Sequence, residues 1–278
     1  MNARSRLRAE KSITWRDDDA GATPLRAESG RDKLSKDDIK LSERDATLEL
    51  GQQIGRCQEM LYAQRKHKLL IILQGMDTSG KDGTVRSLFS HVNPMGLRAV
   101  QFKAPSAHEA AHDFLWRVHQ QVPAWGEIAI FNRSHYEDVL VPVVQEQIDD
   151  KECQRRYAHI AAFEHMLADS GTVIVKLFLH VSKDEQRKRL QARLDDPEKQ
   201  WKFDQSDLVQ RERWDLYHQA YARAIEVTDT DHAPWYIIPA DSKTHRNLLV
   251  STLLLEIMND LGLAFPEPLA RLSKLRID

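Results

Sequence analysis

The chain has 278 residues, and its 40 basic and 42 acidic side chains leave a formal net charge of −2. This length suits one large domain or two small ones and can bury a sizeable core. The isoelectric point near 6.6 argues against a dedicated nucleic-acid binder, since such domains usually lie above about 9. The two cysteines, Cys57 and Cys153, are too few for a disulfide framework or a zinc cluster, which favours a reducing compartment.

The sequence contains no candidate targeting or membrane segment. Residues 1–11 are basic, but no apolar stretch of the kind found in signal peptides follows them. The longest purely apolar run, residues 69–73, is far shorter than the roughly 20 residues that cross a bilayer. Residues 248–258 are rich in apolar side chains, but polar ones interrupt them, as in a core-facing helix. We expect a cytoplasmic protein without a membrane contact.

Residues 1–42 are predicted to form an irregular N-terminal extension. They show neither helical nor strand periodicity, and they contain Gly21, Pro24, Gly30 and the acidic run 17–19. The extension is expected to lie over the main body or to be mobile. A long amphipathic helix is predicted to follow over residues 43–67, because apolar side chains recur there at helical spacing.

The rest of the chain alternates between short apolar segments and helix-length segments. Strands are predicted at 69–73, 98–102, 127–131, 172–179 and 235–238. Helices are predicted at 81–91, 107–120, 134–148, 152–169, 183–195, 206–227 and 243–260. This order is typical of an α/β fold with three layers, in which helices cover both faces of a five-stranded parallel sheet. We expect residues 43–278 to form this single domain, with its ligands beyond the carboxyl ends of the strands.

Directly after the first predicted strand comes the sequence QGMDTSGKDGT, residues 74–84. Gly75, Gly80 and Lys81 satisfy the G-x-x-x-x-G-K pattern of a phosphate-binding loop. Glycines let the backbone wrap around an anion, N–H groups of the loop and helix point at it, and the lysine adds a positive charge. A glycine-rich turn without phosphate chemistry is the alternative, but it leaves the combination of strand, spacing and lysine unexplained.

Two acidic residues depart from the common loop pattern. Asp82 follows Lys81 in place of the Ser or Thr whose hydroxyl usually holds Mg²⁺. Asp77 lies inside the loop, where a bare carboxylate would repel phosphate unless a divalent cation lay between them. Asp77 is therefore a candidate metal ligand, with a role in capping a loop N–H as the alternative. Asp82, in the first helical turn, suits the helix dipole better than it suits a metal.

A second polar cluster follows the third predicted strand, in the sequence NRSHYED at residues 132–138. Carboxylates near this strand end commonly help to hold a metal in phosphate-loop enzymes, and here Glu137 and Asp138 lie a few residues beyond it. Ser134 is a candidate helix N-cap. Arg133, at the carboxyl edge of the sheet, could grip phosphate with two hydrogen bonds. The alternative is an ordinary helix start with an Arg–Glu pair on the surface.

Residues 183–213 are a candidate lid. The segment carries nine basic and eight acidic residues, so it is not basic in net terms. Arg189 and Arg193 share one helical face, and Lys199 and Lys202 follow the break at residues 195–197. Two helices joined by a proline-containing loop and carrying exposed cations suit a lid that closes over phosphates. An ordinary solvated helix hairpin is the alternative.

Taken in order, four motifs resemble those of the family-2 polyphosphate kinases. They are GMDTSGKDGTV at 75–85, FNRSHYEDVLV at 131–141, DPEKQWKF at 196–203 and APWYIIPADSK at 233–243. The resemblance extends over residues 45–265. It implies a phosphate-loop kinase fold similar to that of thymidylate kinases, with a helical lid over about residues 183–215. It further implies phosphoryl transfer between inorganic polyphosphate and nucleotides, dependence on Mg²⁺ (with Mn²⁺ as the alternative), and a homodimer or homotetramer.

The resemblance also implies roles for individual residues. Asp77 and Asp138 resemble metal-binding carboxylates, and Lys81 and Arg133 resemble phosphate clamps; these four are the expected catalytic residues. Arg189, Arg193, Lys199 and Lys202 match basic lid positions that contact polyphosphate. The remaining loop and second-motif residues are expected to bind phosphate or nucleotide: Gly75, Met76, Thr78, Ser79, Gly80, Asp82, Gly83, Thr84, Asn132, Ser134 and Glu137.

The expected function is transfer of phosphoryl groups between polyphosphate and AMP or ADP. The combination of Asn132 and Glu137 resembles the subgroup that phosphorylates both acceptors, with adenine and also guanine nucleotides as candidates. An ATP-dependent nucleoside monophosphate kinase is the nearest alternative, and a nucleotide-binding switch protein is the alternative without turnover. Nucleic acid is not an expected partner, given the isoelectric point and the sparse aromatic residues in the basic segment.

Overall fold

The protein is described by a computed structural model that covers residues 2–268. Five parallel strands form one sheet in the order β2-β3-β1-β4-β5. The strands are β1 (Lys68–Gln74), β2 (Leu97–Gln101), β3 (Ile128–Asn132), β4 (Thr172–His180) and β5 (Trp235–Pro239). Each lies within one or two residues of its predicted position, and the predicted α/β fold is confirmed.

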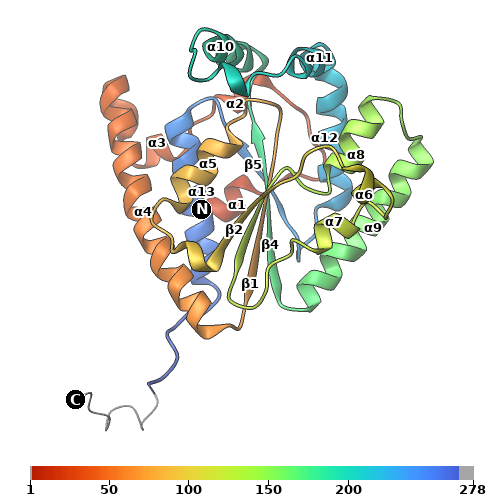
Figure 1. Cartoon of the computed structure of the whole chain (residues 1–278). Coiled ribbons are helices and arrows are strands. Elements are labelled where there is room, and N and C mark those ends of the chain that lie inside the picture. Colours follow the sequence, from red (N-terminus) through yellow and green to blue (C-terminus); the bar gives the residue numbers. More distant parts are fainter. Residues whose placement is uncertain (1, 269–278) are drawn as a thin grey trace.

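Two helical layers cover the sheet, one on each face (Figure 1). One layer consists of α4 (Lys36–Gln64), α5 (Lys81–Phe89) and α13 (Lys243–Asn259). The other consists of α8 (Glu137–Val144), α9 (Asp150–Asp169) and α12 (Trp214–Thr228). Within residues 2–268, no helix is both long and apolar enough to cross a membrane.

Strand β1 lies at the centre of the sheet and of the core. Its residues from Leu69 to Leu73 are at most 1% exposed, because neighbouring strands flank it on both edges and helices cover both of its faces. A strand covered in this way reads as a continuous apolar run without alternation. The phosphate-loop motif therefore starts from the central, buried strand of the sheet.

Some helix boundaries differ from the prediction. Helix α4 begins at Lys36, seven residues before the predicted start at 43, because Ser35 caps it by accepting a hydrogen bond from the Asp38 backbone N–H (3.3 Å). The predicted helix over 107–120 is two short helices, α6 (Ala107–Ala110) and α7 (Trp116–His119). Helix α8 begins at Glu137, so Ser134 is not its N-cap as predicted.

The N-terminal segment, residues 2–35, is more regular than predicted. It contains α1 (Ala3–Leu7), α2 (Asp17–Ala20), α3 (Pro24–Glu28) and the short 3-10 helix η1 (Arg31–Lys33). It covers the free edge of β5, where Arg8 pairs with Tyr236 in an antiparallel bridge and the Ala9 N–H donates to the Trp235 carbonyl (2.9 Å). The segment thus closes an edge that would otherwise be open to strand pairing.

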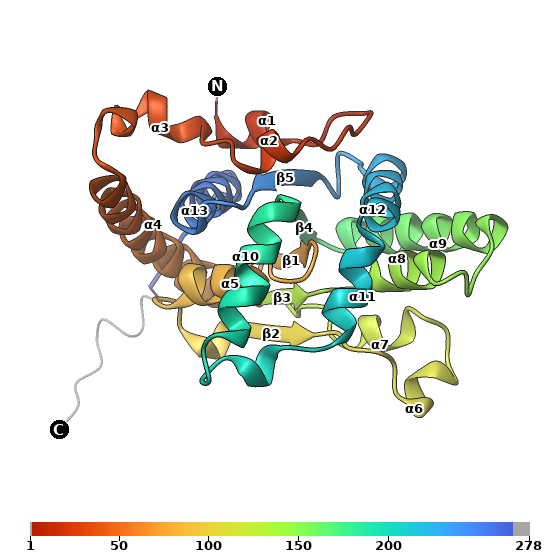
Figure 2. The same ribbon diagram turned by 90° about the horizontal axis from the view of Figure 1, so that it is seen from above.

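The lid consists of α10 (Lys183–Leu194), the 3-10 helix η3 (Gln200–Lys202) and α11 (Ser206–Glu212). Viewed from above, α10 and α11 cross over the carboxyl ends of the central strands (Figure 2). A further 3-10 helix, η2 (Pro94–Gly96), precedes β2. These helices therefore lie above the phosphate-loop motif, where a lid would have to lie.

Candidate active site

The phosphate loop, residues 75–84, connects β1 to α5 in a tightly held turn. Gly75 has φ +145° and Gly80 has φ +105°, which residues with a side chain rarely adopt. A Cβ atom at Gly75 would lie 2.7 Å from the Leu179 carbonyl oxygen, and one at Gly80 would lie 1.8 Å from a nitrogen of Arg246. Both glycines of the motif are thus required by backbone shape and by close packing.

Lys81 lies under the loop and is 8% exposed. Its Nζ donates to the carbonyl oxygens of Gly75 (2.7 Å) and Met76 (3.3 Å). Burial and the nearby charge of Arg133 lower its pKa to about 8, although neighbouring carboxylates oppose the shift. The ammonium group is therefore still mainly charged at neutral pH, and it is held where an anion cradled by the loop would lie.

The pKa of Lys81 predicts how activity depends on pH. Its charged form dominates below pH 8 and is lost above it, so kcat/KM should fall by about tenfold per pH unit in the alkaline limit. The measurement is a profile of kcat/KM for the phosphoryl donor from about pH 6 to 10. The variant Lys81→Arg keeps its charge over this range, so its residual activity should lack the alkaline fall. A wild-type profile that stays flat throughout would contradict the assignment.

Arg133 connects the second motif to the loop. It has φ +63°, and its guanidinium donates to Asp77 Oδ1 (2.6 Å) and lies 3.6 Å from Glu137 Oε2. Burial alone would lower its pKa, but Glu137 and Asp77 raise it above its usual value. Glu137 is itself buried, which raises the pKa of its carboxyl despite the charges of Arg133 and Lys81. The predicted residues Asp77, Arg133 and Glu137 thus form one contiguous group beside the loop.

A second carboxylate, which the sequence interpretation missed, faces Asp77 from the lid. Asp207 in α11 is close enough to Asp77 for their charges to interact, and burial and the charge of Asp77 raise the pKa of Asp207 to about 6. In the described residues, Oδ2 of Asp77 and Oδ2 of Asp207 are both buried without a hydrogen-bond partner. Two facing carboxylates with orphaned oxygens form a place for a cation. No local spacing in the sequence links the two residues.

The Asp138 carboxylate is paired with an arginine, whereas the sequence predicts that it binds a metal. Its Oδ2 accepts from Arg117 (3.2 Å), and its backbone carbonyl accepts from Arg156 (2.8 Å). Burial raises the pKa of its carboxyl, while Arg117 opposes the shift. Arg117 in α7 is 7% exposed and was not predicted as a site residue. A cation could bind Asp138 only through Oδ1, unless Arg117 were released.

Asn132 and Ser134 position neighbouring groups. The Asn132 side-chain amide donates to Asp82 Oδ1 (2.6 Å), and Lys202 of the lid lies 3.9 Å from Asp82 Oδ2. The buried Ser134 hydroxyl accepts from the Tyr136 N–H (3.2 Å) and contacts the amide of Gln74 (3.1 Å). Asp82 thus joins the start of α5, the end of β3 and the lid.

Arg189 is the predicted lid residue whose surroundings differ most from the expectation. It is 8% exposed, and each of its five N–H groups has an acceptor. These acceptors are the carbonyls of Thr78 (3.0 Å), Ser79 (3.2 Å), Ala240 (2.7 Å) and Asp241 (2.8 Å) and the Glu185 carboxylate (2.8 Å). Contact with polyphosphate would have to replace one of these bonds. The structure therefore favours Arg189 as a residue that positions the loop.

Arg246 supports the loop from α13 and was also missed. It is 2% exposed, and it donates to the Ser79 carbonyl (3.2 Å) and to the side chain of Asn247. Burial and the charge of Arg189 lower its pKa to about 9. Within the described residues no carboxylate is paired with it. Two buried arginines thus hold the outer side of the loop backbone.

The other three predicted lid cations are spread out. Arg193 lies 3.6 Å from Asp207 Oδ2 and 3.4 Å from the Lys202 carbonyl. Lys202 approaches Asp82, as described, whereas Lys199 pairs with Asp196 at the exposed turn of the lid. The structure thus brings Arg193 and Lys202 to the site and leaves Lys199 at its edge.

A buried hydrogen-bond network around Glu164 holds the second motif, residues 131–141, in place. Glu164 in α9 accepts from Lys176 of β4 (2.6 Å) and from the Tyr136 hydroxyl (2.9 Å), and it lies 3.1 Å from His135 Nε2. All four side chains are at most 1% exposed. His135 therefore has a structural partner in Glu164.

The donor atoms of the site suit a hard divalent cation that also binds phosphate. Mg²⁺ is commonly held by one or two carboxylates, with water and substrate phosphates completing its coordination. Asp77 and Asp207 supply two carboxylates whose buried Oδ2 atoms accept no hydrogen bond, although Arg193 lies 3.6 Å from Oδ2 of Asp207. Among residues 2–268 there is no group of three or more metal-binding side chains. The residues thus fit a cation shared with a phosphate ligand better than a site built by protein alone.

The parallel sheet, the G-x-x-x-x-G-K loop at its carboxyl edge and the helices above that edge define a phosphate-loop kinase fold. A family model described as "Polyphosphate kinase 2 (PPK2)" matches residues 33–263. The chain belongs to the polyphosphate kinase 2 family, and the predicted membership is confirmed.

Individual relatives agree with this placement. The chain is 52% identical over 234 residues to an "AMP/ADP-polyphosphate phosphotransferase" of Meiothermus ruber, covering 84% of this chain and 88% of that protein. It is 43% identical over 228 residues to an "ADP-polyphosphate phosphotransferase" of Rhodopseudomonas palustris, covering 78% and 79%. It also resembles the crystal structure of Polyphosphate Kinase 2 from Arthrobacter aurescens TC1, with a TM-score of 0.88, 39% identity, and coverage of 96% and 93%.

Proposed function

We propose that this protein is a polyphosphate-dependent nucleotide kinase that transfers phosphoryl groups between inorganic polyphosphate and AMP or ADP, forming ADP or ATP. The observation that carries the proposal is the cluster of Lys81, Arg133, Asp77 and Asp207 around the phosphate loop. The names of the relatives from M. ruber and R. palustris support polyphosphate as the donor. Acceptance of both AMP and ADP rests on Asn132 and Glu137 and on the name of the M. ruber relative.

Transfer of a phosphoryl group needs alignment and charge neutralisation more than covalent help. We propose that the end of the polyphosphate chain and the terminal phosphate of the nucleotide meet above residues 75–84. The loop N–H groups would orient the donor phosphate, and Lys81 and Arg133 would stabilise the charge on the transferring group. The lid would exclude water, so that the phosphoryl group reaches the nucleotide and is not hydrolysed. No side-chain nucleophile is required.

We propose that Mg²⁺, with Mn²⁺ as the alternative, is held between Asp77 and Asp207. Asp138 is a further candidate ligand through Oδ1. When bound, the cation would supply positive charge that offsets the mutual repulsion of the donor and acceptor phosphates. Asp207 belongs to the lid and Asp77 to the loop, so the same pair would hold the lid closed over the substrates.

The test of the function is an incubation with Mg²⁺, long-chain polyphosphate and either AMP or ADP, followed by separation of the nucleotides. The expected products are ADP and ATP. Absence of product with both acceptors would reject the function. Product that forms only when ATP is supplied would favour an ATP-dependent nucleoside monophosphate kinase. We further propose a homodimer or homotetramer in the cytoplasm that uses adenine nucleotides, with guanine nucleotides as further candidates. Light scattering would test the oligomeric state, and GMP or GDP in the same assay would test the base.

Arg193→Ala should raise the KM for polyphosphate several-fold and change the KM for the nucleotide less. Arg193 contacts Asp207 and the Lys202 carbonyl, so its charge lies on the lid side of the proposed donor site. The measurement is steady-state kinetics with each substrate varied in turn, and Arg193→Lys serves as the conservative control. Equal losses for both substrates would contradict a lid contact with polyphosphate.

A further inference from the structure

Two tyrosines of α12, Tyr217 and Tyr221, lie beside the phosphate loop, in the helical layer opposite α5. They are four residues apart, so their side chains share one face of the helix. Helix α12 packs against α8, which begins with Glu137. The ring of Tyr221 is 4.7 Å from the ring of Phe178, which pairs in the sheet with Gln74 directly before the loop. Tyr221 therefore lies at the start of the loop, and Tyr217 lies one helical turn closer to the lid.

Both phenol groups are close to the charged cluster of Asp77, Arg133 and Glu137. Burial raises the pKa of Tyr217, the charges of Glu137 and Asp77 raise it further, and Arg133 opposes the shift. Burial and the same three charges act in the same directions on the pKa of Tyr221. Charge effects of this kind come from groups that lie near one another. The two side chains therefore face the cluster, and both hydroxyls keep their protons at neutral pH.

The hydroxyl of Tyr217 is free to bind a ligand. Tyr217 is only 4% exposed, so its ring is held by packing. Within residues 2–268 its hydroxyl forms no hydrogen bond to the protein, yet it is not one of the fully buried polar atoms without a partner. The small exposed part of the side chain therefore includes the hydroxyl. The buried Tyr136 differs, because its hydroxyl contacts Glu164 (2.9 Å) and Thr228 (2.9 Å). A fixed ring with a free hydroxyl is a preorganised hydrogen-bond donor.

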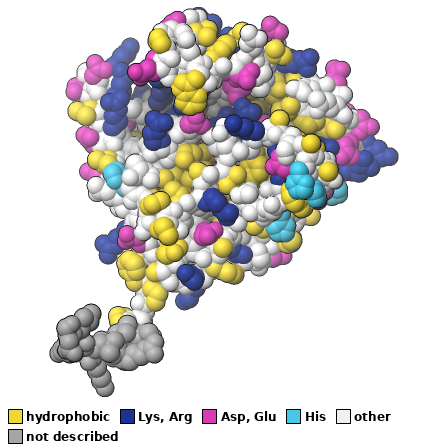
Figure 3. All heavy atoms as spheres, viewed as in Figure 1, with side chains coloured by type: hydrophobic (Ala, Val, Ile, Leu, Met, Phe, Trp, Pro, Cys, Tyr) yellow, Lys and Arg dark blue, Asp and Glu magenta, His cyan; other side chains and the backbone are white. Residues whose placement is uncertain are grey.

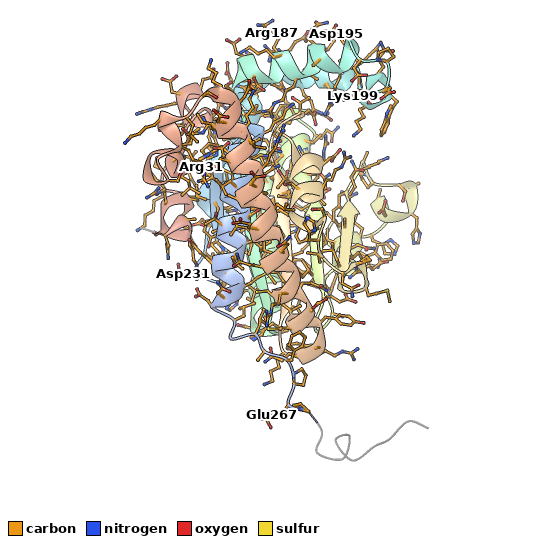
Figure 4. All side chains as sticks on the ribbon, turned by 90° about the vertical axis from the view of Figure 1, so that its left-hand side faces the viewer. Arg31, Arg187, Asp195, Lys199, Asp231 and Glu267 are labelled. Atoms are coloured by element: carbon orange, nitrogen blue, oxygen red, sulfur yellow. The ribbon has the colours of Figure 1, made fainter. Side chains whose placement is uncertain are left out.

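The lid lies above the space that Tyr217 faces. Figure 4 shows the lid from the side, with the labelled Arg187 and Asp195 on its outer surface, away from the strands. The lid also carries Asp207, which is close enough to Asp77 for their charges to interact. Just below the lid, basic and acidic side chains lie next to one another in Figure 3. A neutral phenol adds a hydrogen-bond donor here without changing this balance of charge.

We propose that Tyr217 is a further catalytic residue, whose hydroxyl donates a hydrogen bond to the phosphoryl group in transfer. The proposal rests on the function proposed above, since it assigns this tyrosine a role in the same transfer. During transfer, negative charge is spread over the three equatorial oxygens of the phosphoryl group. Lys81 and Arg133 offset part of this charge, and Tyr217 binds an oxygen from the side of α12. The proton stays on the tyrosine, so its side chain neither forms nor breaks a covalent bond.

Tyr217→Phe removes the hydroxyl and keeps the packed ring. With AMP and long-chain polyphosphate, kcat should fall by about ten- to a hundredfold, whereas both KM values should change by less than about twofold. The midpoint of thermal unfolding should equal that of the wild type, because the hydroxyl has no partner among the described residues to lose. A kcat equal to that of the wild type would overturn the proposal. A large drop in the midpoint would also overturn it, since it would reveal a structural partner.

The matched control is Tyr157→Phe. Tyr157 lies in α9 of the same helical layer and is 1% exposed. Its neighbours include Cys153 and Arg223, neither of which belongs to the site. This variant should keep the kcat of the wild type. A loss as large as that of Tyr217→Phe would show that the effect is not specific to the site, and would overturn the catalytic role.

A double-variant cycle separates a direct contact with phosphate from an action through Glu137, whose charge lies near Tyr217. The variants are Tyr217→Phe, Glu137→Gln and the two combined. If the tyrosine binds phosphate directly, its loss should lower kcat by a similar factor in both backgrounds. If Tyr217→Phe has no further effect once Glu137 is replaced, the tyrosine acts through that carboxylate and the direct contact is overturned.

A binding measurement keeps this inference separate from the proposed function. Aluminium fluoride with Mg²⁺, pyrophosphate and ADP imitates a phosphoryl group between donor and acceptor, and a transition-state mimic should tighten the binding of ADP to the wild type. Tyr217→Phe should lose about tenfold or more of that gain in affinity. An equal gain in both proteins, or no gain in the wild type, overturns the contact even if polyphosphate is converted to ATP. A smaller gain in the variant supports it even if polyphosphate is not the donor.

Discussion

Lys81→Ala is expected to lower kcat by about a hundredfold or more, by analogy with the loss of one preorganised electrostatic donor. The Lys81 ammonium is buried and hydrogen-bonded to the carbonyls of Gly75 and Met76. It is therefore already in position, and little rearrangement is needed when charge develops above the loop. The measurement is the initial rate of ADP formation from AMP and long-chain polyphosphate at saturating Mg²⁺. Loss of an interaction made mainly in the transition state should appear in kcat more than in KM.

A fold control is needed because removing a buried side chain leaves a cavity and two carbonyls without their partner. Lys81→Met fills most of the volume of the lysine side chain and removes the ammonium group with its charge and its hydrogen bonds, so it should be as inactive as Lys81→Ala. The midpoint of thermal unfolding shows whether each variant is folded. A folded Lys81→Met variant with nearly full activity would exclude Lys81 from catalysis.

Asp77→Asn and Asp207→Asn are each expected to lower activity by about a hundredfold and to raise the Mg²⁺ concentration that gives half-maximal rate. Both changes keep the size of the side chain and remove its charge. The two carboxylates face each other and have orphaned oxygens, so a cation between them would lose one of its two protein ligands. The measurement is a Mg²⁺ titration of the rate with both substrates saturating. Unchanged activity with unchanged Mg²⁺ dependence would exclude the pair as the metal site.

Asp204→Asn is the matched control for charge. Asp204 lies in the lid three residues before Asp207 and accepts from the Ser206 N–H (2.8 Å), a contact that asparagine can also make. Its Mg²⁺ requirement should equal that of the wild type. Asp138→Asn separates the two roles left for that residue: a shifted Mg²⁺ requirement indicates a ligand, whereas lower activity without a shift indicates positioning through Arg117.

The sequence predicted those parts of the structure whose residues are adjacent in the chain. The apolar run of β1 followed by G-x-x-x-x-G-K located the loop, and Lys81 and Arg133 lie beside it as expected. Asp207 and Arg246 were missed because each reaches the loop from an element distant in the chain, and no local pattern encodes such a contact. Arg189 was recognised as basic, but its burial depends on carbonyls that only the fold brings near it.

Helix lengths explain the remaining differences. The helices of the N-terminal segment have four or five residues, which is too short for apolar periodicity to appear. The sequence at the start of α4 does contain a pattern typical of a helix N-terminus, Ser35 followed by acidic residues in the first turn. The periodic apolar pattern, however, begins only later in that helix. Periodicity therefore located the helices that pack on the sheet and missed the short ones.

The two arginines behind the phosphate loop have a consequence for the order of folding. The loop is synthesised early, but its outer side is held by Arg189 and Arg246, which come much later in the chain. Arg189 in turn donates to carbonyls of the β5–α13 connection. That connection is bonded to the N-terminal segment, because the Asp241 N–H donates to the Ala20 carbonyl (3.1 Å). These are contacts of high sequence separation, which form late because long loops must close first. A nascent chain in which α13 has not yet been synthesised therefore has the motif but lacks the bond from Arg246 to the Ser79 carbonyl that holds the loop.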